Sequence, residues 1–221
     1  MSTVILACGS LRRYVEAAQS KMGTDFSVVY ADNSLHSEPE KMNARLKELL
    51  RELPEDVDTV LVAMGYCGGS WDKVPHRQKL VVPCVDDCVT LLLHTGDERC
   101  PNKKEAGHMY ICDKTSDDDN FSIPAIRRKV FAEHGEYNGD MIFKSWFGMY
   151  HDLDIIDTGM YDCYDEEFVT YAQESADLIF ADLNFVEGSN YLLEKLVAGV
   201  WDEQFVVKAP EETMDLFDFA P

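Results

Sequence analysis

Three cysteines occupy similar places in this sequence, and their thiols offer the clearest chemistry. Cys8, Cys67 and Cys88 each follow an apolar run of the kind that forms a buried strand, and a glycine comes directly after the first two. The carboxyl ends of parallel strands meet at one edge of a sheet, and open α/β sheets bind ligands there. We therefore expect the three thiols to lie together at such an edge.

Thiols gathered in this way suggest a metal centre. Thiolates bind zinc at about 2.3 Å, and a catalytic zinc has three protein ligands and one open position. Cys84 or Cys163 is a possible fourth ligand. Zinc, or alternatively iron, would activate a substrate thiol or polarise a leaving group.

Two other interpretations of the cysteines stay open. No Cys-x-x-Cys pair is present at these positions, and cysteine is often a small buried core residue, so Cys8 and Cys67 would then only fill tight turns. Alternatively, Cys88 alone is a nucleophile. It is expected in the first turn of a helix, where the helix dipole lowers the pKa of a thiol.

Polar residues are expected beside the thiols. Asp86, Asp87 and Asp157 all follow apolar runs and are expected on the same rim. An aspartate before a helix usually caps it. One that does not cap would orient a ligand or act as a base, which makes Asp87 and Asp157 the catalytic candidates.

Two glycine-bearing loops are candidates for binding a cofactor. They contain Gly65, Gly68 and Gly69 in one loop, and Thr158 and Gly159 in the other. Neither loop has a Walker lysine or a Gly-x-Gly-x-x-Gly spacing, so no nucleotide site is predicted. Glycine here would let the backbone approach a ligand or a neighbouring loop closely. Among the histidines, His76 is the best candidate for the site, and His108 and His151 have no motif around them.

Apolar runs that alternate with helical patterns predict an α/β fold. It is a doubly wound, mostly parallel sheet with helices on both faces, in a single domain over residues 1–221 with an acidic tail from about residue 211. The expected strands are Thr3–Ala7, Phe26–Tyr30, Asp58–Met64, Leu80–Val82, Gly107–Cys112, a strand from Leu153 and Leu178–Phe185, and Trp201–Val207 is expected as an edge strand or an extended arm. The expected helices include Pro39–Leu53, capped by Ser37 with Glu40, and Pro124–Tyr150, broken near Gly135–Gly139.

The charge of the chain limits its partners. Twenty Lys and Arg residues against 41 Asp and Glu residues give a net charge of −21. Such a chain repels phosphate backbones and anionic membranes, so neither nucleic acid nor a membrane is an expected partner. No apolar run reaches the roughly 18 residues of a membrane span, and no secretion signal is evident. The seven cysteines are then expected as reduced thiols in the cytoplasm.

The motifs and their order resemble a known family. They are Ala-Cys-Gly, Gly-Tyr-Cys-Gly-Gly, Pro-Cys-Val-Asp-Asp-Cys, Ile-Asp-Thr-Gly and Glu-Gly-Ser. The chain resembles, from Cys8 to about Pro210, a bacterial and archaeal family that is filed as a domain of unknown function. Members of that family often show Tyr-Gly-x-Cys-Gly and Pro-Arg-x-x-Asp-Cys. This chain has Cys84 where the family usually has arginine, and that difference would alter the ligand or the metal site.

The resemblance also implies a metabolic setting. Genes of that family are often associated with corrinoid-dependent methyltransferase systems for methylamines and similar one-carbon donors. Three hypotheses follow. The first is a metal-binding enzyme or enzyme component that acts on a small substrate or a methyl carrier, with a corrinoid protein as a possible partner. The second is a non-enzymatic carrier of a metal, cluster or corrinoid, and the third is a metal-free thiol enzyme that uses Cys88.

Overall fold

The computed structural model describes residues 2–32, 34–35, 38–113 and 122–220. The chain divides into two compact units, Met1–Lys103 with Ser189–Pro221, and Lys104–Gly188. We describe each unit by itself. The expectation of a single domain over residues 1–221 stays a prediction.

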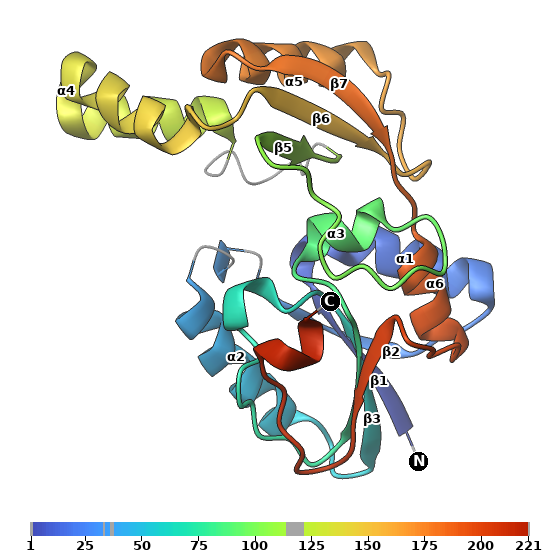
Figure 1. The fold of residues 1–221 in the computed structure, drawn as a ribbon. Helices are drawn as coiled ribbons and strands as arrows, with labels where there is room; N and C mark the ends of the chain where they lie inside the picture. The colour runs from blue at the N-terminus through green and yellow to red at the C-terminus, as the bar shows by residue number, and fades with distance from the viewer. Residues whose placement is uncertain (1, 33, 36–37, 114–121, 221) are drawn as a thin grey trace. The chain divides into compact units, whose positions relative to one another are not determined.

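The first unit is built on a five-stranded sheet in the order β2-β1-β3-β4-β8, in which β8 alone is antiparallel to its neighbour (Figure 1). Its strands are β1 Ser2–Cys8, β2 Ser27–Ala31, β3 Val57–Ala63, β4 Lys79–Pro83 and β8 Phe205–Lys208. Its helices are α1 Arg12–Met22, α2 Pro39–Glu52, α3 Cys88–Leu93 and α6 Tyr191–Ala198, with short 3-10 helices η1 Gly9–Leu11, η3 Cys67–Gly69 and η4 Leu216–Phe219.

The strand order contains a switch point between β1 and β3. The chain passes from β1 to β2 on one side and then returns to add β3 on the other side of β1. Right-handed crossovers then place α1 and α2 on opposite faces of the sheet. The apolar runs of β1, β3 and β4 are consequently buried from both sides, as in Ile5, Leu61 and Val81 at 0%, 1% and 0% exposure.

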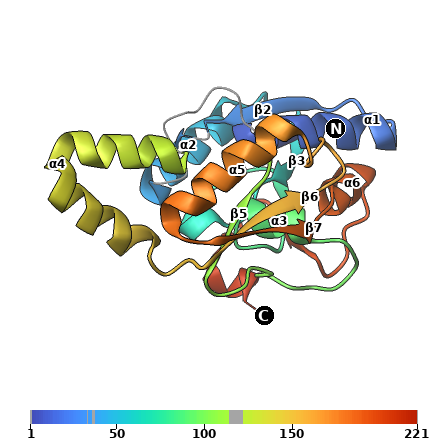
Figure 2. The ribbon, with the colours of Figure 1, turned by 90° about the horizontal axis from the view of Figure 1, so that it is seen from above.

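The second unit is a smaller α/β layer. Its three parallel strands, β5 His108–Ile111, β6 Asp152–Asp157 and β7 Asp182–Glu187, form a separate sheet in the order β5-β6-β7. Helices α4 Ile123–Phe147 and α5 Glu166–Ile179 accompany it, and its core includes Leu153, Phe143 and Ile179. Figure 2 shows α4 as two helical arms, which meet at Gly135, whose φ of 74° is not helical.

The structure confirms the α/β class with mostly parallel strands and surrounding helices, but it divides the strands differently from the expectation. The strand from Leu153 and the strand near Phe185 belong to the second sheet. They cannot extend the first sheet beyond β4, because β8 already pairs with the outer side of β4. In this antiparallel pair, Leu80 lies opposite Lys208 and Pro83 lies opposite Phe205. The predicted edge strand is thus the element that closes the first sheet.

The start of α2 and the acidic tail were also subjects of prediction. The predicted cap Ser37 lies outside the described residues, and Glu38 precedes α2. The acidic tail contains η4, which Asp215 caps through a capping box with Asp218, and Phe219 is buried. The end of the tail is therefore a packed element of the first unit.

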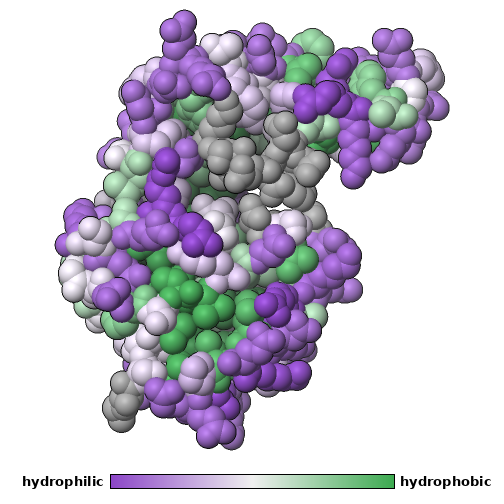
Figure 3. Space-filling view, turned by 180° about the vertical axis from the view of Figure 1, so that it is seen from behind, coloured by the Kyte–Doolittle hydropathy of each residue, from purple (hydrophilic) through white to green (hydrophobic). Residues whose placement is uncertain are grey.

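The surface seen in Figure 3 is mostly hydrophilic, with an apolar area on the lower part of the view, which is the first unit. This matches a chain that carries 41 acidic residues. In the described ranges, no helix combines the length and the apolar character needed to cross a bilayer.

Candidate functional site

The carboxyl edge of the first sheet brings three thiols together. Cys8 is the last residue of β1, Cys67 begins η3 shortly after β3, and Cys88 is the first residue of α3. The Cys88 side chain hydrogen-bonds with the side chains of both Cys67 and Cys8. Cys88 therefore contacts both other thiols at the switch point between β1 and β3, where sheets of this order bind ligands, although the three sulfur atoms do not all lie within 4.8 Å of one another.

A close approach of two backbones holds the Cys67 loop beside α3. A Cβ atom at Gly65 would lie 2.6 Å from the Asp87 Cα atom and 2.7 Å from its nitrogen, so only glycine fits. Next to this contact, Tyr66 N donates to Val85 O at 2.9 Å and Cys67 N donates to Asp86 O at 2.7 Å. Gly65 thus serves loop-to-loop packing, which is one of the two uses predicted for it.

The Cys67 loop is tightly folded. Cys67, Gly68 and Gly69 all have positive φ angles of 48°, 66° and 96°. A residue other than glycine is uncommon in this conformation, and such strain concentrates at functional sites. The turn directs Cys67 toward Cys88 at the start of α3. Gly68 packs against Pro39, since a Cβ atom added at Gly68 would lie 3.2 Å from the Pro39 Cγ atom.

Cys8 is the most buried of the three cysteines. Its side chain is 0% exposed, and its sulfur lies 3.0 Å from Ser10 Oγ, with which it hydrogen-bonds. Cys67 and Cys88 are partly exposed. The cluster is therefore open from the side of the two loops and closed from the side of β1.

The thiol cluster changes the acidity of Cys88. Hydrogen bonds with Cys67 and Cys8, together with burial, hold the pKa of the Cys88 thiol well above its usual range. The prediction of a lowered pKa is wrong for the metal-free chain. Helix α3 has only six residues, and its dipole is outweighed by the neighbouring thiols.

We expect Cys88 of the metal-free chain to react with iodoacetamide at pH 7 more slowly than an ordinary thiol, because only the thiolate attacks. Cys100, which is partly exposed and lies on a loop, is the internal reference. Mass spectrometry of alkylated peptides over time measures both rates. Faster alkylation of Cys88 than of Cys100 below pH 7 would restore the lone-nucleophile hypothesis.

The two aspartates before α3 differ in their roles. Asp87 is the N-cap, and its carboxylate accepts a hydrogen bond from Thr90 N at 2.9 Å. This is the capping role expected of an aspartate that precedes a helix, and a catalytic role for Asp87 stays a prediction. Asp86 lies beside it and lines a cavity.

That cavity, of about 460 Å³, lies against the two loops that carry Cys67 and Cys88, although neither cysteine lines it. It is lined by Tyr66, Gly68, Gly69, Asp86, Asp87 and Leu216. Apart from Leu216 of η4, these residues lie one or two positions from Cys67 or Cys88 in the chain. The Tyr66 ring stacks on Phe219 with centroids 4.6 Å apart, so η4 supports one wall. The cavity has room for a small ligand.

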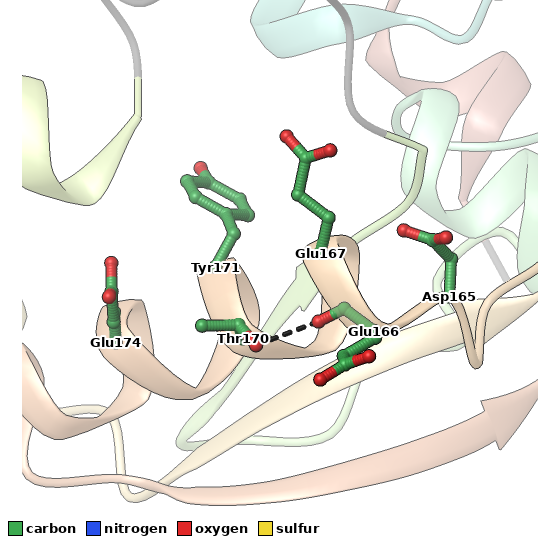
Figure 4. Close-up of a pocket in the computed structure, with 6 residues that line it drawn as sticks. All are labelled: Asp165, Glu166, Glu167, Thr170, Tyr171 and Glu174. Carbon is green, nitrogen blue, oxygen red and sulfur yellow. Dashed lines mark hydrogen bonds between the residues drawn. The ribbon is translucent and has the colours of Figure 1, made fainter.

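A larger hollow of about 650 Å³ lies along α5 in the second unit. Asp165, Glu167, Tyr171 and Glu174 project from one side of the helix there (Figure 4). Asp165 caps α5 by accepting from Phe168 N at 3.0 Å. The lining is acidic and contains no thiol or imidazole, so we assign no chemistry to this hollow.

Several predicted site residues lie elsewhere. The Cys84 thiol is buried and donates to the carbonyl oxygen of Asp218 at 3.5 Å, and Cys163 belongs to a core cluster of the second unit. Neither is among the thiol partners of Cys88. His76 precedes β4, at the opposite edge of the first sheet, and its Nδ1 is bonded to Gln78 O at 2.6 Å.

The loop that carries Asp157, Thr158 and Gly159 belongs to the second unit. Asp157 ends β6, so the expectation that it shares a sheet edge with Asp87 is wrong, because β6 belongs to the other sheet. Asp157 Oδ1 accepts from Gly159 N at 3.1 Å, and Thr158 Oγ1 accepts from Met160 N at 3.4 Å. These bonds order the loop itself, and binding roles for Asp157, Thr158 and Gly159 stay predictions.

Sequence reasoning missed a second cluster of potential ligands. Among the described residues, His108, His151 and Asp152 offer three ligand atoms that all lie within 4.8 Å of one another. The available signal was that His108 and Asp152 each begin a strand, since neighbouring parallel strands also align their first residues.

The chain matches a family model over residues 30–197, and the description of that family is "Protein of unknown function (DUF1638)". The match covers more than half of the 221 residues. The chain belongs to this family. The DUF1638 region contains Cys67 and Cys88 as well as the histidine cluster, whereas Cys8 precedes it. Comparisons with curated proteins and with solved structures give no match.

Proposed function

We propose that this member of the DUF1638 family is a metal-binding protein in which Cys8, Cys67 and Cys88 hold a zinc-class ion. The observation that carries the proposal is the hydrogen bonding of Cys88 with both other thiols at the switch point of the sheet. Residues from three separate segments contribute, and the Gly65 contact keeps two of them together.

The donor set suits a soft or borderline metal. Thiolates select zinc and iron over magnesium and calcium. The contacts of Cys88 with both other thiols fit this use, and each thiol that binds the ion would release its proton to solvent. Zinc with three thiolates keeps one open position, and a metal held in this way activates a substrate thiol or polarises a leaving group.

The open position would face the cavity of about 460 Å³ beside Cys67 and Cys88. We propose a small-molecule substrate or a methyl carrier as its occupant. The resemblance to a family linked with corrinoid-dependent methyl transfer supports a place in one-carbon metabolism in the cytoplasm, with a corrinoid protein as a possible partner. Asp86 and Asp87 line the same cavity and would orient the occupant.

Metal analysis of the anaerobically purified chain tests the proposal. We expect Cys67→Ser to hold about one equivalent of metal less than the wild type, because the tight turn leaves no substitute ligand. With Co²⁺ in place of zinc, thiolate binding adds a charge-transfer band in the near ultraviolet, and Cys67→Ser should remove it.

Cys163→Ser is the matched control, because it removes a buried thiol of the second unit that is not a partner of Cys88. Its metal content and Co²⁺ spectrum should equal those of the wild type. A metal-free wild type that shows no Co²⁺ charge-transfer band on titration would overturn the proposal.

The net charge of −21 favours a second candidate, a carrier that delivers its metal or a corrinoid to a basic partner protein. Complexes between oppositely charged surfaces weaken as salt is added. The carrier candidate requires salt-sensitive partner binding and metal release to that partner, with no turnover of methyl donors. Turnover by the isolated metal-loaded chain would favour the enzyme.

A further inference from the structure

The amino-terminal edge of the second sheet carries a compact group of histidine and aspartate side chains. His108 begins β5, and its register partner Asp152 begins the adjacent strand β6 (Figure 1). His151 directly precedes Asp152. His108 Nε2 lies 3.5 Å and His151 Nδ1 lies 2.5 Å from the same oxygen, Asp152 Oδ2. The three atoms thus converge on one point at the surface.

The remaining polar atoms of His108 and Asp152 are held by buried or partly buried neighbours. His108 Nδ1 bonds to Asp154 Oδ2 at 2.7 Å, and the Asp154 side chain is 1% exposed. Asp152 Oδ1 accepts from Asn184 Nδ2 at 2.6 Å. A carboxylate behind a histidine fixes the ring and its tautomer, which is how metal-binding histidines are usually supported.

Asp154 has a further distinctive feature. Its other oxygen, Oδ1, has no hydrogen-bond partner among the described residues, although the side chain is buried on β6. A buried carboxylate with one unsatisfied oxygen is costly unless positive charge lies nearby. His108 lies between Asp154 and the surface, so a cation bound to His108 would compensate the charge of the Asp154 carboxylate.

The backbone at Gly107 fixes the position of the His151 ring. Gly107 has a φ of +85°, and a Cβ atom there would lie 2.1 Å from His151 Nε2, so the ring lies directly over this glycine. His151 N also donates to Gly107 O at 2.8 Å. With the ring placed by Gly107, the Nδ1 atom is the one directed toward Asp152.

We propose that His108 Nε2, His151 Nδ1 and Asp152 Oδ2 form a second metal site, for a divalent transition ion of the zinc class. Two imidazoles and one carboxylate are a common three-ligand set for zinc, and the fourth position is left to water or a ligand. Glu105 Oε2, at 3.7 Å from His108 Nε2, is a candidate for that position. This site is independent of the thiol cluster, which lies in the other unit.

Binding requires no redox step. The ion forms bonds to the two imidazole nitrogens and the carboxylate oxygen, and the proton shared between His151 Nδ1 and Asp152 Oδ2 leaves to solvent. The site therefore binds Zn²⁺ with proton release, as expected for histidine ligands.

Zinc titration of the full-length, metal-stripped chain tests the proposal, with Zn²⁺ alone as the probe and calorimetry as the readout. The Cys67→Ser background removes the thiol contribution. We expect one equivalent to bind in that background and binding to be lost in Cys67→Ser/His151→Ala. Asp154→Asn, which alters only the support of His108, should weaken binding roughly 10-fold or more.

His134→Ala is the matched control, because His134 is an exposed histidine of the same unit beside a glutamate, with its Nε2 atom 3.8 Å from Glu133 Oε2. It should bind zinc like the Cys67→Ser parent. The His151 side chain is 67% exposed, so its loss should leave unfolding of the metal-free chain unchanged. Should that variant nevertheless unfold, Asp152→Asn keeps the side-chain shape and must also lose binding.

The outcomes separate the two metal proposals. Co²⁺ bound to nitrogen and oxygen ligands absorbs in the visible region without the near-ultraviolet thiolate band, so each site has its own signature. Equal zinc stoichiometry and affinity in the Cys67→Ser parent, the His151→Ala variant and the His134→Ala control would overturn this second site. That result would leave the thiol proposal untouched.

Discussion

Replacing Gly65 with alanine should lower the stability of the chain by about 2–4 kcal/mol and abolish thiolate metal binding. The new methyl group would lie 2.6 Å from the Asp87 Cα atom, and both partners are backbone, so the loops must separate. Separation carries Cys67 away from Cys88. Urea denaturation measures the free energy of unfolding, and the Co²⁺ charge-transfer band measures the metal site.

Gly96→Ala is the matched control for this change. Gly96 lies in the same unit, has no positive φ, and has nothing within 4 Å of its added Cβ. Its stability should stay within about 0.5 kcal/mol of the wild type, with the metal band intact. A Gly65→Ala chain as stable as this control, with an unchanged band, would contradict the loop contact on which the thiol site depends.

Gly107→Ala should reduce zinc affinity at the histidine cluster by about 100-fold or more, because it displaces a ligand rather than a supporting residue. The methyl group would lie 2.1 Å from His151 Nε2 and must push the ring away. The ring is largely exposed and can turn into water. The stability cost is therefore mainly the positive φ of +85°, or roughly 1 kcal/mol. Calorimetry in the Cys67→Ser background measures the affinity.

The comparison for that result is Gly23→Ala. Gly23 has a similar φ of +67°, and a Cβ there would meet nothing within 4 Å. It should lose similar stability and keep full zinc affinity. If Gly107→Ala and Gly23→Ala bind zinc equally well, the ring position over Gly107 is irrelevant to the site.

Most helices and strands could be predicted because burial of an element requires apolar residues at characteristic positions in the sequence. The apolar runs of β1, β3 and β4 are continuous, since helices cover both faces, and α2 begins at the predicted Pro39. The division into two sheets could not be predicted. Strand pairing depends on which edge remains free, and the short β8, far along the chain, occupies the edge of β4.

The candidate site could be predicted only in part from the sequence. The meeting of Cys8, Cys67 and Cys88 follows from strand order, because an apolar strand that ends in a turn places its next residues at the carboxyl edge. The placement of Asp157 failed because the same reasoning was applied to a strand of another sheet. The histidine cluster was missed because its members lie at amino-terminal edges, where no motif directs attention.

The interrupted first unit has a consequence for biosynthesis. Its chain leaves at Lys103 and resumes at Ser189, with the whole second unit made in between. As the chain emerges from the ribosome, β1, β3 and β4 are complete long before α6 and β8 exist to shield them. Strands β3 and β4 therefore lack these neighbours for the entire time that the second unit is translated, so chaperone protection would matter most in that interval.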